Sequence, residues 1–202
     1  MGEPQYRLEG IVHTRSETME DFEGPLDVIF LLLSKNKIEI QDVSITAILE
    51  QYLAYLEEMK QTCGTSFIGA SVYTAEDVED FLEMCPWLDA IQIPMNVLDT
   101  RIVQRGLLEE LKKRGVAVFV RSVFLQGMLC MDKAPEKFSF MQPSLDAINE
   151  VAKAGGMTLP QMAVAYIRDL PGVTSLVLGC ETPEQVRDNA NLINTRALTV
   201  AE

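Results

Sequence analysis

The residues that most often bind metals or form cross-links are few and scattered in this 202-residue chain. It has one histidine, His13, and four cysteines that lie far apart without a C-x-x-C pair, namely Cys63, Cys85, Cys130 and Cys180. Zinc sites and disulfide frameworks need closely spaced or paired ligands, so we expect neither. We expect free thiols, a cytoplasmic location and no bound metal.

The charge of the chain argues against one class of partner. The formal net charge is −13 at pH 7, and acidic residues outnumber basic ones both before and after residue 60. Proteins that bind nucleic acid directly gather Lys and Arg against its phosphates, so we expect no such contact. The N-terminus lacks the pattern of an export signal, and the longest apolar run, residues 28–33, is far shorter than a membrane span. We therefore expect no membrane association.

The first part of the chain predicts two helices after a short strand over residues 6–12. Pro25 suits the first turn of a helix that runs to about Ser34. Ser44 can cap a second helix, whose apolar residues recur at three- and four-residue spacing: Ile45, Ile48, Leu49, Tyr52, Leu56 and Met59. Such a stripe usually packs into the protein's own core, although it can also bind a partner helix.

Three blocks in this part carry a family resemblance: residues 21–27 (DFEGPLD), residues 31–40 (LLLSKNKIEI) and residues 51–56 (QYLAYL). They resemble the N-terminus of segregation and condensation protein A, a bacterial kleisin of chromosome partition and cell division. The resemblance implies a helical segment that packs on the neck of an SMC ATPase through Ile45, Ile48, Leu49, Tyr52 and Leu56. The kleisin segments that recruit the companion protein B and close the ring have no counterpart after Lys60, so we do not expect protein B to bind.

From residue 67 onward the pattern alternates between strand and helix. Strands are predicted over residues 67–73, 89–94, 116–120 and 175–178. Helices are predicted over residues 74–84, 103–114, 144–154 and 159–169, with a last one that begins at Thr182. This alternation and spacing predict parallel βα units of the α/β class.

Four blocks in order carry a second resemblance: residues 68–74 (IGASVYT), 91–99 (IQIPMNVLD), 121–129 (RSVFLQGML) and 177–189 (VLGCETPEQVRDN). Residues 64–199 resemble the C-terminal half of an aldo/keto reductase, a TIM-barrel family that uses NADPH. The resemblance implies about four βα units of an incomplete TIM barrel behind a small kleisin-like helical segment. We divide the chain into a truncated kleisin segment (1–60), a junction (61–66) and the reductase half (67–202).

The resemblance also implies half of a cofactor site. Ser71 and Gln92 stand where the family binds the nicotinamide amide, and Arg121 stands where many members stack an aromatic ring. The loop and turn that would follow the phosphates, with the residues near the adenine, add Ser122, Gly127, Gly179, Gln185, Asp188 and Asn189. Gly179 and Gln185 replace the Lys or Arg of many members, so NADPH and NADH are both candidate cofactors. Gln92 and Ser122 could instead be packing residues at a barrel mouth.

The family's proton donor is absent from this half. Aldo/keto reductases protonate the carbonyl oxygen through a tyrosine, assisted by lysine, aspartate and histidine, all on the first half of the barrel. We find no counterpart of this Asp/Tyr/Lys/His tetrad and predict no catalytic residue.

Three hypotheses of different classes follow. The first is a chimera of two truncated families that has neither activity. The second is a binding module whose N-terminal helices dock on an SMC ATPase. The third is a carbonyl reductase rebuilt by dimerisation, because four parallel strands leave two open edges that a second copy could pair.

Overall fold

The computed structural model describes residues 53–54, 56–58, 60–61 and 67–199. The chain divides into two compact units, residues 1–66 and 67–202. The described residues of the first unit are helical, and Leu53 and Leu56 among them are half-buried. The predicted strand over residues 6–12 and the predicted first helix lie outside the described residues. So do four of the predicted partner-binding residues, namely Ile45, Ile48, Leu49 and Tyr52. The kleisin-like segment therefore stays a prediction.

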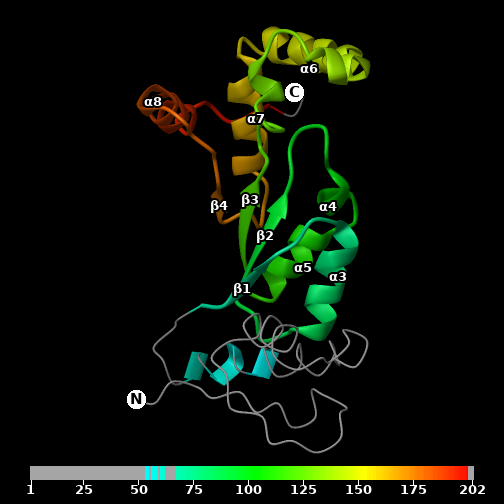
Figure 1. Ribbon diagram of the computed structural model, residues 1–202, viewed down its shortest axis with the longest axis vertical. Coiled ribbons are helices and arrows are strands. Elements are labelled where there is room, and N and C mark those ends of the chain that lie inside the picture. The colour runs from blue at the N-terminus through cyan, green and yellow to red at the C-terminus, as the bar shows by residue number, and fades with distance from the viewer. Residues whose placement is uncertain (1–52, 55, 59, 62–66, 200–202) are drawn as a thin grey trace, which may run out of the picture. The chain divides into compact units, whose positions relative to one another are not determined.

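The second unit is built on four parallel strands, which pair in sequence order (Figure 1). They are β1 (Gly69–Ser71), β2 (Ala90–Pro94), β3 (Ala117–Arg121) and β4 (Ser175–Leu176). The register places Ser71 beside Gln92 and Gln92 beside Phe119. Because all pairs are parallel, the carboxyl ends of the strands lie at one edge of the sheet. This arrangement confirms the predicted α/β fold class.

Helices connect the strands and close one face of the sheet. They are α3 (Ala75–Met84), α4 (Arg101–Gln104), α5 (Leu107–Lys113), α6 (Gln142–Ala154), α7 (Leu159–Arg168) and α8 (Pro183–Leu192), with short 3-10 turns at Met128–Cys130 and Glu136–Met141. The predicted helix over residues 103–114 is divided, since Gly106 has φ 69° between α4 and α5. That left-handed conformation costs glycine little and interrupts the helical hydrogen bonding.

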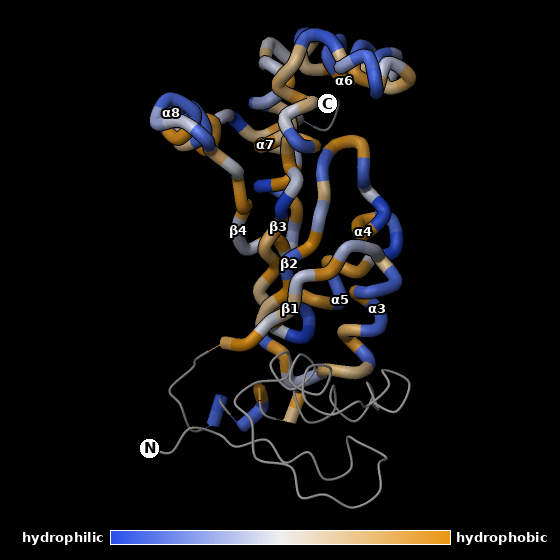
Figure 2. The backbone as a smooth tube through the Cα atoms, viewed as in Figure 1, coloured by the Kyte–Doolittle hydropathy of each residue, from blue (hydrophilic) through white to orange (hydrophobic). Residues whose placement is uncertain are grey.

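Side chains alternate between the two faces of the sheet, as the period of a strand requires. Ile91 and Ile93 of β2 and Val118 and Val120 of β3 are at most 1% exposed, so they form the covered face. The residues between them are half-buried and form the other face. Figure 2 shows hydrophobic residues gathered along the strands, whereas α8 is mostly hydrophilic. We call the second face the open face; it carries Ser71, Gln92, Phe119 and Arg121.

Two helices begin with the caps that their sequences predict. Thr74 accepts a hydrogen bond from the Asp77 amide at 3.0 Å, and the Asp77 carboxylate accepts one from the Thr74 amide at 2.9 Å. Thr182 likewise caps α8 by accepting from the Gln185 amide at 3.2 Å. These caps satisfy amides that no helical carbonyl can reach, and they fix where the chain turns from a strand into a helix.

Candidate functional site

Polar side chains meet on the open face where β1 and β2 pair. The Ser71 hydroxyl donates a hydrogen bond to the Gln92 Oε1 atom over 3.3 Å. Among the described residues, the Gln92 Nε2 group donates to no acceptor. The pair therefore presents an unused amide NH2 group above the sheet, which could donate to a carbonyl or phosphate oxygen of a ligand.

Arg121 ends β3 and reaches across the sheet to the loop that follows β1. Its Nη2 atom donates to the Val72 carbonyl oxygen at 3.1 Å, and its Nη1 atom donates to Ser122 Oγ at 3.5 Å. The guanidinium carbon lies 4.5 Å from the centre of the Tyr73 ring. This cation–π contact and the carbonyl hold the side chain in one orientation at the carboxyl ends of the strands.

The loop after β3 has an unusual backbone. Three residues other than glycine have positive φ angles, Ser122 (62°), Leu125 (48°) and Gln126 (54°), and Gly127 follows at 86°. Residues other than glycine adopt this region at a cost of about 1 to 3 kcal/mol each, and such strain gathers at ligand sites. The buried side chains of Val123, Met128 and Leu129 anchor the loop. Backbone hydrogen bonds within the loop, from the Leu125 and Met128 amides to the Ser122 and Leu125 carbonyls, also fix it beside Arg121.

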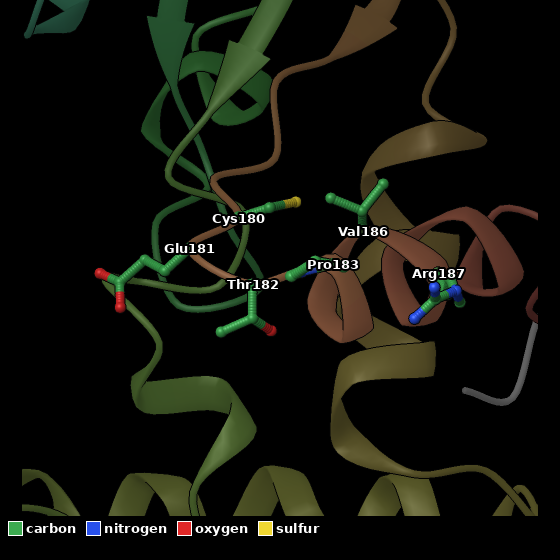
Figure 3. A pocket seen from close by; sticks show the side chains of 6 residues that line it. All are labelled: Cys180, Glu181, Thr182, Pro183, Val186 and Arg187. Atoms are coloured by element: carbon green, nitrogen blue, oxygen red, sulfur yellow. The ribbon is translucent and has the colours of Figure 1, made fainter.

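A second loop lies between β4 and α8 and borders an open hollow (Figure 3). The hollow is lined by Cys180, Glu181, Thr182, Pro183, Val186 and Arg187. Figure 3 shows the Cys180 thiol and the Val186 side chain on facing sides of it. The Asn189 Nδ2 group donates to the Gly179 carbonyl oxygen at 3.3 Å and contacts Cys180 Sγ at 3.0 Å. Asn189 thereby ties the turn to the second half of α8.

The charges around the hollow are mostly acidic. Arg187 is the one cation among its lining residues, and it pairs with Glu184 at 3.3 Å. Both side chains are more than 70% exposed, so solvent screens the pair. Glu181 adds a further carboxylate. A singly charged or neutral ligand group fits this lining better than a doubly charged phosphate monoester.

The comparisons with known proteins decide the family. The model of the aldo/keto reductase family matches residues 11–202. The chain belongs to the aldo/keto reductase family. A solved aldo-keto reductase from Bacillus halodurans in its holo form superposes with a TM-score of 0.66 over 76% of this chain and 53% of that one, at 21% identity. That likeness confirms a TIM-barrel-like fold.

Curated relatives fall into two groups. L-glyceraldehyde 3-phosphate reductase of Escherichia coli K12 is 24% identical over 182 residues, which are 76% of this chain and 52% of that protein. Segregation and condensation protein A of Thermoanaerobacter sp. X514 is 28% identical over 135 residues, 65% of this chain and 53% of that protein. The same protein of Streptococcus mitis is 52% identical over 42 residues, 21% of this chain and 17% of that protein. The chain thus spans about half the length of the first two relatives.

The predicted cofactor residues of this aldo/keto reductase lie on the strands and in the loops at the carboxyl-end edge of the sheet. Ser71 contacts Gln92, and Arg121 contacts Ser122, as described above. Gly179 and Asn189 meet in the second loop, where the Gln185 side chain accepts a hydrogen bond from the Glu181 amide at 2.6 Å. Gly127 ends the first loop, and Asp188 is exposed on α8. Their roles toward a cofactor remain predictions.

Two contacts at this edge were missed by sequence reasoning. The Val72 carbonyl and the Tyr73 ring hold Arg121, although Tyr73 is 69% exposed. An aromatic residue directly after a strand was the available signal. Its partner could not be named, because β2 lies between the two strands that supply the contact.

Burial shifts the pKa values of three titratable side chains in a direction that does not suit proton transfer at neutral pH. Burial raises the pKa of the Tyr166 hydroxyl, whereas a proton donor working near neutrality needs a lowered one. Burial likewise raises the pKa of the Cys130 and Cys85 thiols, which keeps both protonated. His13 and Cys63 lie outside the described residues. Residues 67–199 contain no gathered set of three potential metal ligands and no helix suited to crossing a bilayer.

Proposed function

We propose that residues 67–199 bind a nicotinamide dinucleotide, NADPH or NADH, across the carboxyl ends of β1 to β4. The observation that carries this proposal is that unused donors, a strained loop and an open hollow all follow strands whose ends share one edge. In parallel α/β folds, ligands bind at this edge.

Each predicted residue has a role that suits its surroundings. The unused Gln92 amide, beside Ser71, would bind the carboxamide of the nicotinamide. The loop that begins at Ser122 would face the pyrophosphate, because left-handed residues turn backbone amides toward an anion. The turn at Gly179 would face the adenosine phosphate, with Asp188 and Asn189 near the adenine. The bound dinucleotide would supply hydride chemistry.

We further propose that this chain by itself does not reduce carbonyl compounds. Burial raises the pKa of the Tyr166 hydroxyl, which does not suit it to protonate a carbonyl oxygen near neutral pH. The chain also spans about half of the L-glyceraldehyde 3-phosphate reductase of E. coli. The purified chain should give no carbonyl-dependent oxidation of NADPH or NADH on an aldehyde panel. Turnover that exceeds the blank would contradict this part of the proposal.

Calorimetric titration of the full chain tests dinucleotide binding. We expect saturable binding of one NADH or NADPH per chain, weakened by about tenfold in Gln92→Ala, since one hydrogen bond to a ligand is lost. Gln104→Ala is the matched control, because the Gln104 side-chain amide lies on α4 and, among the described residues, donates only to Thr100 Oγ1, at 2.8 Å. No heat from either dinucleotide would overturn the proposal, and equal loss in both variants would overturn the role of Gln92.

A second copy of the chain could complete the barrel. Among the described strands, β1 and β4 each pair on one side only. A twofold axis parallel to the strands would place β4 of each copy beside β1 of the other, which gives eight parallel strands. Val177, which follows β4 and is 43% exposed, would enter this junction. Sedimentation should then show a dimer that Val177→Asp dissociates; a monomer at all concentrations would exclude the rebuilt reductase.

A second candidate function rests on the match to S. mitis segregation and condensation protein A, 52% identical over 42 residues. We propose that residues 1–60 dock on the neck of an SMC ATPase through Ile45, Ile48, Leu49, Tyr52 and Leu56. The full chain should capture a purified neck fragment, and Leu49→Asp should abolish capture while Glu57→Gln, on the polar side of the predicted stripe, should not. Absence of capture by the unaltered chain would exclude this function and leave the dinucleotide proposal intact.

A further inference from the structure

Arg121 differs from the other arginines whose ion pairs the structure describes. These are five arginines, each paired with a carboxylate: Arg101, Arg105, Arg114, Arg168 and Arg187. Within residues 67–199 no carboxylate lies within ion-pair distance of Arg121, although its side chain is half-buried. In a chain of net charge −13, a half-buried cation without an acid is a local exception. Its charge is available to an anion from outside the chain.

The guanidinium is already oriented before any ligand arrives. The Val72 carbonyl accepts from Nη2 at 3.1 Å, and the Tyr73 ring lies under the guanidinium carbon at 4.5 Å. An arginine fixed in this way loses little further side-chain freedom on binding, which is the usual cost of recruiting a long cationic side chain. If Arg121 only held the two loops together, the contacts with the Val72 carbonyl and the Tyr73 ring would be sufficient.

Donor capacity remains after those contacts are made. Arginine has five N–H groups, and the described contacts of Arg121 use one on Nη2 and one, at 3.5 Å, toward Ser122 Oγ. The remaining donors suit the paired oxygens of a carboxylate or a phosphoryl group. The Gln92 amide donor lies on the same open face, on the strand next to β3. Both residues therefore present donors on the same face of the sheet, and no carboxylate of the described residues pairs with Arg121.

The geometry points to a subsite in which Arg121, assisted by the Ser122 hydroxyl and the Gln92 amide, binds a carboxylate or phosphoryl group at the carboxyl ends of β2 and β3. The dinucleotide proposed above is not needed for this step. The group can come from a phosphate of a bound nucleotide or from a small organic anion that binds beside it. Charge, donor number and a preset orientation all favour an anion over a neutral ligand.

The test uses the full chain and 2-phosphoglycolate, which carries both kinds of anionic group. Calorimetry at low salt should show saturable binding, with ethylene glycol as the neutral comparison. Arg121→Gln should weaken binding by at least about tenfold, because a charged hydrogen-bonding partner is lost. Arg105→Gln is the matched control, since Arg105 pairs with Glu76 and Glu79 on the helical side. Unchanged binding in Arg121→Gln, or no binding by the unaltered chain, would overturn the subsite.

A second variant guards against loss of folding. Arg121→Lys keeps the positive charge but removes the planar guanidinium with its paired N–H donors. It should therefore bind more weakly than the unaltered chain but more tightly than Arg121→Gln. Circular dichroism of each variant checks its fold. If Arg121→Gln does not fold, the comparison rests on Arg121→Lys. Should Arg121→Lys bind as tightly as the unaltered chain, the paired N–H donors of the guanidinium would not contribute, and the subsite would be overturned.

Two further titrations identify the source of the anion. Methyl phosphate and glycolate, measured separately, show which group the subsite prefers. Repeating the 2-phosphoglycolate titration with saturating NADH then separates the two sources. Competition assigns the subsite to a nucleotide phosphate, whereas undiminished binding assigns it to a second molecule. Since the probe is first measured without NADH, failure of the subsite and failure of dinucleotide binding give different results.

Discussion

Whether each arginine at the candidate site pairs with a carboxylate decides the local charge there. Arg187 borders the hollow before α8 but pairs with Glu184, and Glu181 adds a second acid beside it. Arg121, at the end of β3, has no such partner in the described part of the chain. The two loops at the same edge therefore differ: the first favours an anion, and the second has its one lining cation partly neutralised.

Cofactor preference should follow from the Arg187 pair. With Glu184 in place, we expect NADH to bind at least as tightly as NADPH. Glu184→Gln frees Arg187 and should strengthen NADPH binding by about twofold to threefold, the scale of an exposed ion pair, while NADH binding stays unchanged. Calorimetry with both dinucleotides measures this. Equal gains for NADH and NADPH would show that Arg187 does not sense the 2′-phosphate.

The Asp77 carboxylate should give the fold an acid-sensitive contact. Amides of Tyr73 and Thr74 donate to it at 2.9 Å each and hold its pKa below the ordinary value. A lowered pKa adds stability above the ordinary value of about 3.9, and this stability is lost as the pH falls through the lowered value. Asp77→Asn should therefore flatten the fall in the urea midpoint between about pH 5 and pH 2.

Asp80→Asn is the matched control for this effect. Asp80 lies on the same helix, and its side chain accepts no hydrogen bond from the described residues. Replacing the Asp80 carboxylate should leave the fall in the urea midpoint between about pH 5 and pH 2 unchanged. If both variants flatten that fall equally, the Asp77 hydrogen bonds are not its source.

At the scale of the elements, close approach between β1 and β2 fixes one strand position. A Cβ added at Gly69 would overlap the carbonyl oxygen of Ala90 and lie 2.8 Å from its carbonyl carbon. Gly69→Ala should destabilise the chain by about 1 to 3 kcal/mol, the usual cost of overpacking. Gly179→Ala, where an added Cβ meets nothing within 4 Å, should change the free energy of unfolding little. Chemical denaturation compares them, and equal effects would contradict the close approach.

The elements also show what sequence patterns can and cannot predict. Period and caps predicted β2, α3 and the start of α8 to within about two residues, because apolar alternation, Thr74 and Thr182 are local signals. The 3-10 turns from Met128 to Met141 were missed, since no apolar periodicity marks them. The break at Gly106 was missed because a single glycine inside a helical pattern is usually tolerated.

The candidate site shows the same division between local and distant signals. The strands that carry Ser71, Gln92 and Arg121 could be predicted from the sequence and from the family resemblance. The contact of Arg121 with Val72 and Tyr73 could not, because it joins segments about 50 residues apart through the register of three strands. Side-chain direction across a sheet depends on that register, which local patterns do not specify.

At the scale of the whole molecule, the described residues hold four parallel strands with an open edge on each side. The aldo/keto reductase family model nevertheless matches residues 11–202, which includes residues 11–60 of the predicted kleisin-like segment and the whole junction. The match to segregation and condensation protein A is high in identity only over 42 residues. A chimera of the two families therefore remains a prediction, while membership in the aldo/keto reductase family is established.

Hydrogen–deuterium exchange of the full chain, with and without saturating NADH, tests the central claim most directly because it locates the ligand. Dinucleotide binding at the strand ends predicts slower exchange in residues 121–129 and 179–189. It predicts no change in the last turn of α3, because this helix begins at the carboxyl end of β1 and returns the chain toward the amino ends of the parallel strands. Unchanged exchange at both loops, or protection confined to α3 and α5, would contradict a dinucleotide site at the carboxyl ends of the strands.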